Sequence, residues 1–209
     1  MRRRRKTIRG TIIRTGRRCS SCPAIFTGKR DTPGESQIKG DDDMQIHDRG
    51  EPLSEQSLQE LEEKLGVRLP APYRRFLQEY NGGRPEPDVL DIAGAPFGTV
   101  GVREFFGVGK DYETYELLWL LEERRASLGD DVLAIACDSS GDLYGIVTKG
   151  EQRGRVYFFD YYASWEPYFV ASDFDAFLQK LRPLTPEELA LIEAGAATAV
   201  VVDLDKPVE

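Results

Sequence analysis

Apolar side chains recur at helical spacing near residue 60 and predict a first amphipathic helix. Leu58, Leu61 and Leu65 fall on one face of such a helix. Ser54 is a favourable N-cap residue just before them. Gly66 accepts a left-handed backbone at little cost, so it predicts the end of this helix.

A second helix is predicted to follow at once, which gives a compact helical hairpin. Pro70 and Pro72 suit a first helical turn, because the N–H groups there have no partner within the helix. The apolar face of this helix consists of Tyr73, Phe76, Leu77 and Tyr80. The sequence Asn81-Gly82-Gly83 tolerates positive φ angles and predicts where the helix stops.

The middle of the chain changes from helical spacing to the shorter period of β-strands. Residues 84–100 are rich in Gly and Pro and predict a loop with short strands at most, while residues 102–109 predict a strand. Residues 112–127 predict a surface helix, with leucines 117, 118 and 121 inward and glutamates 113, 116, 122 and 123 outward. Further strands are predicted at 131–137, 143–148, 155–161 and 166–170.

Two more helices are predicted after the strands. The first spans residues 173–181, is capped by Ser172 or Asp173, and turns Phe174, Phe177, Leu178 and Leu181 inward. Thr185 opens a capping box with Pro186 at the first helical position, which predicts a last helix to about Ala194. The order of elements predicts an α+β fold: an N-terminal helical hairpin, a central, mostly antiparallel sheet, and C-terminal helices packed on it.

Aromatic residues are concentrated between positions 157 and 165. Strand alternation assigns Tyr157, Phe159 and, at the strand end, Tyr161 to the core, and the other half of the series to the surface. Tyr162 and Trp165 are then exposed next to acidic residues, a composition typical of protein-binding hot spots.

Three motifs, in order along the chain, resemble one known family. They are LEEKLGVRLPAPYRRFLQEYNGG (residues 61–83), VLAIACDSSGDLYGIV with GRVYFFDYY (132–147 and 154–162), and SDFDAFLQKL (172–181). This ordered set resembles the SUKH superfamily, typified by the yeast Smi/Knr cell-wall regulator, over residues 53–182. The positions that carry the resemblance are Leu65, Gly66, Leu69, Pro70, Tyr73, Phe76, Leu77, Asn81, Gly82, Gly83, Gly141, Asp142, Val156, Phe174, Phe177 and Leu178.

Charge is unevenly distributed along the 209 residues. Residues 1–43 hold 12 Lys/Arg and 5 Asp/Glu, whereas residues 44–209 hold 16 and 31, a net charge of −15. An acidic body repels nucleic-acid phosphates and attracts basic proteins by long-range steering. We therefore expect a basic protein partner and no direct nucleic-acid binding by residues 44–209.

The composition of the ends predicts the domain boundaries. Residues 1–43 are basic and poor in apolar periodicity, so we expect a disordered extension, either a transit peptide or a nucleic-acid-binding arm. The only methionines are Met1 and Met44, and we hypothesise that residues 1–43 are an over-extended gene start. Residues 44–52 are expected to form a linker, 53–182 the SUKH-like domain, and 183–209 a C-terminal helix and tail. No apolar run or signal sequence indicates a membrane or secretion, so a cytoplasmic protein is expected.

Few side chains in the sequence suggest catalysis or metal binding. Asp138, Asp142 and Asp160 invite comparison with a metal or acid–base cluster, but DSSGD lacks the alternation of a calcium loop, and turn chemistry is favoured. A zinc site would have to combine Cys19 and Cys22 with Cys137 and the single histidine, His47, so no metal, cofactor or catalytic residue is expected. His47 is placed in the linker, and Cys137 is expected to be a buried thiol.

The resemblance implies a non-enzymatic immunity protein that binds and blocks a cognate, nuclease-like toxin. A regulatory scaffold of cell-wall synthesis is the alternative within the same family, and a metal-dependent hydrolase using the three aspartates is the alternative outside it. The residues expected to contact a partner are Asp138, Asp142, Asp160, Tyr162, Trp165 and Glu166. The sequence leaves the oligomeric state open.

Overall fold

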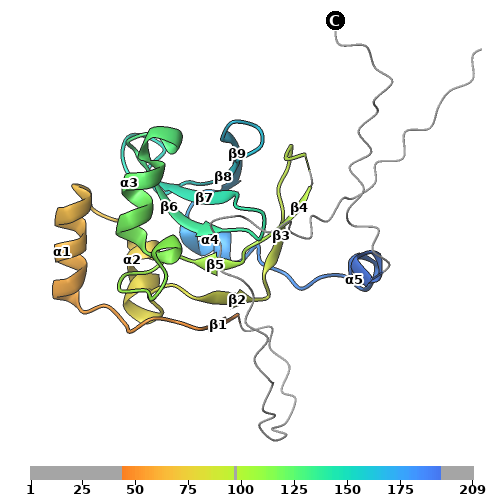
Figure 1. The fold of residues 1–209 in the computed structure, drawn as a ribbon, viewed down its shortest axis with the longest axis horizontal. Coiled ribbons are helices and arrows are strands. Elements are labelled where there is room, and N and C mark those ends of the chain that lie inside the picture. The colour runs from red at the N-terminus through yellow and green to blue at the C-terminus, as the bar shows by residue number, and fades with distance from the viewer. Residues whose placement is uncertain (1–43, 97, 194–209) are drawn as a thin grey trace, which may run out of the picture.

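The computed structural model describes residues 44–96 and 98–193, and a five-stranded antiparallel sheet is at its centre (Figure 1). Its strands lie in sequence order: β5 (Glu104–Phe105), β6 (Val132–Cys137), β7 (Leu143–Val147), β8 (Val156–Asp160) and β9 (Glu166–Ala171). Helices precede the sheet and others follow it and pack on it, so the predicted α+β architecture is confirmed. The strand predicted at 102–109 is shorter than expected and is limited to β5.

The N-terminal helical hairpin forms as the local chemistry predicts. Helix α1 (Glu55–Leu65) begins after Ser54, whose hydroxyl accepts a hydrogen bond from the N–H of Ser57 at 3.0 Å. It ends where Gly66 adopts a φ of 68°. Helix α2 (Ala71–Glu79) starts after Pro70 and buries Tyr73, Phe76 and Leu77. Leu69, in the connection between the two helices, is also buried.

The segment Asn81-Gly82-Gly83 joins this hairpin to the sheet, and all three residues have positive φ angles. Gly83 exchanges two backbone hydrogen bonds with Phe105 of β5, at 3.0 and 2.8 Å. A Cβ on Gly83 would lie 2.5 Å from the carbonyl oxygen of His47, so the close approach of these two backbone segments requires glycine. The side chain of Asn81 is buried and binds backbone groups on both sides of this junction.

Two short two-stranded sheets accompany the central sheet. Strand β1 (Gln45–His47) pairs with β2 (Arg84–Glu86), and β3 (Val89–Asp91) pairs with β4 (Thr99–Gly101), both antiparallel. The expectation of a plain linker at 44–52 therefore misses β1, and His47 lies in this strand with Nε2 2.8 Å from a carboxylate oxygen of Glu86. Three residues carry too short an alternation to predict a strand.

The helix predicted at 112–127 is divided in the structure. A short 3₁₀ turn, η1 (Glu113–Tyr115), precedes α3 (Leu117–Leu128), which ends just before Gly129. Leu117 and Leu120 are buried, and Leu118 and Leu121 pack against the core from its edge. The backbone of Glu116 is extended, with a ψ of 118°, and this breaks the helix that the leucine spacing alone indicates.

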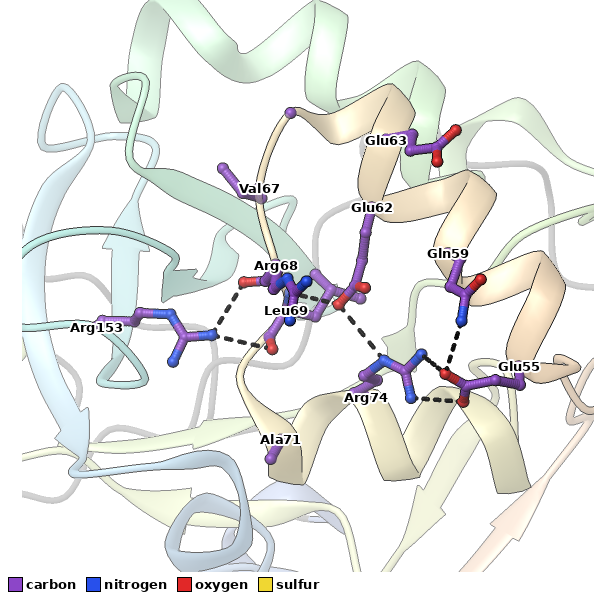
Figure 2. A pocket seen from close by; sticks show the side chains of 11 residues that line it. Glu55, Gln59, Glu62, Glu63, Val67, Arg68, Leu69, Ala71, Arg74 and Arg153 are labelled. Carbon is purple, nitrogen blue, oxygen red and sulfur yellow. Dashed lines mark hydrogen bonds and ion pairs between the residues drawn. The ribbon is translucent and has the colours of Figure 1, made fainter.

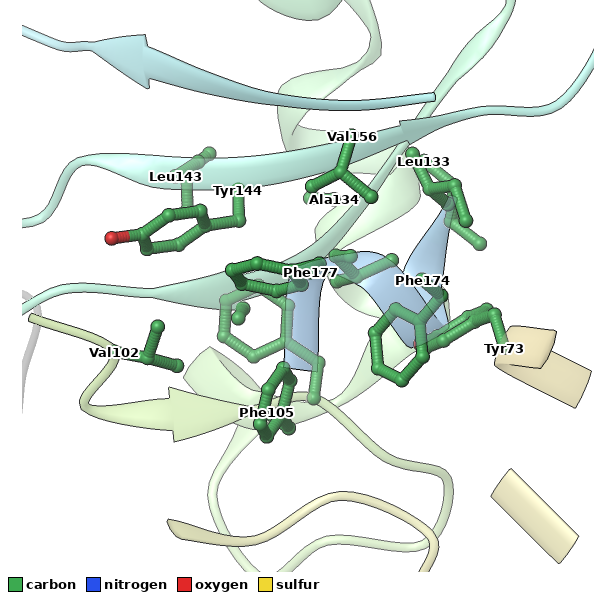
Figure 3. Close-up of a cluster of buried hydrophobic side chains, with 14 of the residues drawn as sticks. Tyr73, Val102, Phe105, Leu133, Ala134, Leu143, Tyr144, Val156, Phe174 and Phe177 are labelled. Carbon is green, nitrogen blue, oxygen red and sulfur yellow. The ribbon is translucent and has the colours of Figure 1, made fainter. Parts of the chain in front are cut away.

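The core lies between the sheet and the helices on its two faces (Figures 1 and 3). Helix α4 (Phe174–Leu178) covers one face, where Phe177 stacks on Tyr144 of β7 at 5.2 Å and Phe174 meets Tyr73 at 5.0 Å. Helix α3 packs on β6. Because side chains alternate between the faces of a strand, the burial of every residue of β7 shows that both faces are covered.

Two expectations about this region are wrong. Phe158, assigned to the surface by alternation, is fully buried and lies 5.2 Å from Tyr144, because α4 covers its face of the sheet. The last helix of the domain, predicted to reach Leu181, ends at Leu178. Asp173 is its N-cap and accepts a hydrogen bond from the N–H of Ala176 at 2.8 Å. Val156 is buried, and Leu178 is partly buried at the edge of the core.

Helix α5 (Pro186–Glu193) forms the predicted capping box: Thr185 Oγ1 accepts from the N–H of Glu188, and Glu188 accepts from the N–H of Thr185. Arg182 attaches this helix to β3, since its guanidinium donates to Asp91 and to Glu188 at 2.8 Å. These bonds raise the pKa of Arg182 and lower that of Glu188 to about 2. The expected end of the helix at Ala194 lies outside the described residues.

Candidate functional site

The turn between β6 and β7 is built around two buried carboxylates. Asp138 Oδ1 accepts hydrogen bonds from the N–H groups of Ser140 (2.7 Å) and Asp142 (2.9 Å), the pattern by which aspartate organises a turn. Gly141 supplies the positive φ, 94°, that this turn needs. Asp142 itself is 0% exposed, and its Oδ1 accepts from the N–H of Tyr161 at 2.8 Å. The first turn thereby holds the start of the β8–β9 loop.

Asp160 organises that second loop from inside. Its Oδ1 accepts from the N–H groups of Tyr162 (2.8 Å) and Ala163 (3.1 Å), and its backbone carbonyl accepts from the N–H of Trp165 at 2.7 Å. Asp138, Asp142 and Asp160 are all buried. Their side chains therefore organise the turn and the loop from the interior.

The tip of the loop holds an unusual backbone. Ser164 and Trp165 both have positive φ angles, 57° and 66°, and the N–H of Glu166 donates to the carbonyl of Ala163 at 3.2 Å. This is the pattern of a type I′ turn, whose central positions favour Asn and Gly. A bulky residue at such a φ costs on the order of 1–3 kcal/mol, and strain of this kind concentrates at functional sites.

Three rings of this loop form an exposed aromatic cluster, which consists of Tyr161, Tyr162 and Trp165. The ring of Tyr161 stands edge-to-face against Tyr162 at 5.3 Å and against Trp165 at 5.1 Å. Tyr161 is 52% exposed and Tyr162 62%, and Trp165 is half-buried. The guanidinium carbon of Arg124, on α3, lies 5.6 Å from the centre of the Trp165 ring, within the range of a cation–π contact.

The predicted partner-binding residues thus divide into two groups. Tyr162 and Trp165 lie in the loop and Glu166 is the first residue of β9, and all three reach the surface, whereas the three aspartates are buried. Sequence reasoning missed Tyr161, which alternation had assigned to the core, and Arg124. Tyr161 is exposed because β8 ends at Asp160, one residue before the predicted end of the strand, and alternation stops there.

An open hollow of about 770 Å³ lies in the helical hairpin, between α1 and the start of α2 (Figure 2). Its charged side chains bind one another: Arg74 donates to both oxygens of Glu55 at 2.7 and 2.8 Å. Glu62 accepts from the N–H of Leu69 at 2.8 Å, and Arg153 donates to the carbonyls before Pro70. These contacts brace the helical hairpin and leave the hollow without a converging reactive group.

Candidate catalytic and metal-binding chemistry is limited in the part of the chain that the structure describes. Among residues 44–96 and 98–193, no group of three or more His, Cys, Asp or Glu side chains is arranged to hold a metal ion. Burial raises the pKa of the Glu104 carboxyl group to about 7, but no histidine or nucleophile is hydrogen-bonded to it in this region. Cys137 is buried in β6.

The fold and the loop define an acidic α+β domain that presents an exposed aromatic surface. Residues 52–180, more than half of the chain, match the SMI1/KNR4 family (SUKH-1), and the protein belongs to this family. Domains of this family are generally non-catalytic immunity proteins. No curated protein matches the sequence. None of the described helices has the length and hydrophobicity needed to cross a bilayer.

Proposed function

We propose that this protein is an immunity protein that binds a cognate toxin and blocks it without catalysis. The toxin is a basic, nuclease-like protein, and the protein acts in the cytoplasm, where such a toxin reaches its substrate. Membership of the SMI1/KNR4 family supports the general role. The observation that carries the choice of partner is the acidic excess of the folded part: residues 44–193 hold 28 Asp/Glu and 15 Lys/Arg.

Electrostatics explain why an acidic domain suits this task. A nuclease site is basic because it holds phosphates, and an acidic protein competes for that site and is steered toward it. Opposite charges across an interface mainly raise the association rate. Speed is what a cell needs when a toxin enters before it has been neutralised.

The aromatic cluster supplies the second part of an interface. Tyrosine and tryptophan are enriched among the residues that dominate binding energies, because they combine large apolar area with a polar tip. Tyr161 and Tyr162 are more than half exposed on a loop that buried carboxylates hold in place. This arrangement supports contact with a protein partner at the β8–β9 loop, with Glu166 beside the rings.

A pull-down with the full chain as bait, from lysate of the source organism at low and high salt, is the first test. The matched bait is the double variant Tyr161→Ala/Tyr162→Ala, which keeps every charge. We expect one basic protein that is retained at low salt and weakened at high salt. Expressed alone it should kill a sensitive host, and co-expression with this protein should restore growth.

Two results would contradict the proposal. In one, the captured basic protein is not toxic. In the other, its toxicity is unchanged when this protein is co-expressed at a level that saturates binding. Capture of several envelope-synthesis or signalling proteins in place of a toxin would favour the regulatory scaffold.

A further inference from the structure

We propose that the aromatic cluster of Tyr161, Tyr162 and Trp165 is a receptor for an arginine side chain of the basic partner. This inference rests on the proposed function and adds the chemistry of recognition to it. The partner's guanidinium lies over the exposed tyrosine rings and is held by cation–π attraction, while the acidic surroundings favour its approach.

The arrangement of the three rings carries the inference first. Tyr161 is nearly perpendicular to both neighbours, with interplanar angles of 84° to Tyr162 and 75° to Trp165. Rings that meet at right angles present π faces in different directions around one point, as in the aromatic cages that bind cationic groups. The tyrosine rings are the exposed members, so the accessible π surface belongs to them.

The protein already places one guanidinium on this cluster. Arg124 lies on the same helical face of α3 as the buried Leu117, Leu120 and Leu128, and its Cζ is 5.6 Å from the Trp165 ring centre. A planar guanidinium stacks on aromatic faces better than an ammonium group does. This contact shows that the Trp165 ring accepts a guanidinium, the same group that we place over the exposed tyrosine rings.

Charge complementarity identifies the occupant. The folded part carries an excess of 13 acidic over basic residues in positions 44–193. Glu122 and Glu123 are exposed on α3 next to Arg124, and Glu166 is exposed at the end of the loop. An aromatic surface within such a field favours a cationic side chain over an apolar one. The chain's own basic residues 1–43 are the rival occupant, and replacement of their arginines by glutamine distinguishes them from a partner.

The test uses the full chain and a defined probe, the peptide acetyl-(Gly-Arg)₃-amide, followed by proton NMR. A side chain that sits over aromatic rings shows an upfield ring-current shift of its δ-methylene protons, whereas contact with carboxylates alone does not. Peptides with lysine or with citrulline, the neutral isostere of arginine, serve as ligand controls. Tyr112→Ala is the matched protein control, because Tyr112 is 56% exposed and lies outside the cluster.

The expected result is an upfield shift for the arginine peptide, a smaller one for lysine and none for citrulline. Each ring removed by Tyr161→Ala or Tyr162→Ala should weaken the affinity about two- to five-fold, the range of an exposed cation–π contact. Tyr161→Phe and Tyr162→Phe keep the ring and should retain the shift, as should Tyr112→Ala. Trp fluorescence and circular dichroism check that each variant is folded.

Three outcomes would overturn the inference. In the first, the peptide binds in a salt-dependent way with no upfield shift, which indicates adventitious contact with the acidic surface only. In the second, the shift persists in the double alanine variant. In the third, the shift appears only after Arg2, Arg3, Arg4 and Arg5 are replaced by glutamine, which identifies the N-terminal segment as the occupant.

The inference and the proposed function fail separately. If the double variant Tyr161→Ala/Tyr162→Ala protects against the toxin as well as the wild type does, the immunity role stands and the arginine receptor is refuted. An arginine-specific shift in a protein that protects against no basic toxin would retain the receptor and remove the immunity role.

Discussion

Replacing Asn81 by alanine removes three hydrogen bonds at the junction between the helical hairpin and the sheet. Its Nδ2 donates to the carbonyls of Glu51 and Val108, both at 2.9 Å, and its Oδ1 accepts from the N–H of Val108 at 2.8 Å. The side chain is 1% exposed, and its backbone has a φ of 47°. One residue therefore joins three segments of the chain while it occupies a conformation that alanine disfavours.

The magnitude follows from these contacts. A net value of about 1 kcal/mol for each lost hydrogen bond gives about 3 kcal/mol. The left-handed backbone adds roughly 1 kcal/mol for alanine. Asn81→Ala should therefore lower the free energy of unfolding by about 4 kcal/mol, a large part of the 5–15 kcal/mol typical of a domain.

Urea unfolding followed by circular dichroism measures this loss, and Asn81→Gly separates its two components. Glycine removes the same hydrogen bonds but accepts the positive φ, so it should cost about 3 kcal/mol. The reasoning is refuted if Asn81→Ala stays within 1 kcal/mol of the wild type. If the glycine variant is destabilised as much as the alanine variant, the backbone contribution is absent.

Three further predictions concern buried polar groups and the strained loop. Tyr144 Oη donates to the carbonyl of Gly101 at 3.0 Å, whereas Tyr73 Oη is buried without a hydrogen-bond partner among the described residues. In urea unfolding, Tyr144→Phe should therefore cost about 1 kcal/mol, and Tyr73→Phe should be neutral or stabilising. Burial raises the pKa of Glu104 from 4.5 to about 7, so the stability is highest below about pH 4.5 and falls as the pH rises through 7. Glutamine carries no charge at any pH, so Glu104→Gln should raise the free energy of unfolding at pH 8 by on the order of 3 kcal/mol. The pH profile of thermal unfolding should become flatter in this variant. Ser164→Asn should stabilise the fold by roughly 1 kcal/mol, because asparagine tolerates the positive φ at this exposed turn; an unchanged or lower midpoint of unfolding would contradict the assignment of strain.

The helical hairpin could be predicted from the sequence because its limits are set by local chemistry. Ser54 caps α1, Gly66 ends it with a φ of 68°, and the Asn81-Gly82-Gly83 segment ends the second helix with three positive φ angles. Each signal acts within one turn of the chain. The positions of strands β6 to β9 could be predicted equally well, because hydrophobic runs separated by turn residues mark each strand locally.

Features that depend on contacts between distant segments could not be predicted. Phe158 is buried because Phe177 and Tyr144 cover its face, and alternation along β8 carries no information about α4. Arg124 contacts the aromatic cluster because α3 packs on the sheet and places the guanidinium over the Trp165 ring. Strand β1 depends on its distant partner β2: His47 pairs with Arg84 in the ladder, and its ring contacts Glu86, 39 residues away along the chain.

The aspartates explain how the strained loop persists in a stable protein. Two consecutive non-glycine residues with positive φ would relax if the loop were held only by its own turn. Asp142 holds Tyr161 from the neighbouring β6–β7 turn, and Asp160 holds the residues that follow, through three hydrogen bonds of 2.8–3.1 Å from backbone N–H groups. A net value of about 1 kcal/mol for each such bond offsets a large part of the strain. The buried aspartates that resemble a reactive cluster in the sequence thus hold the loop that exposes the tyrosines.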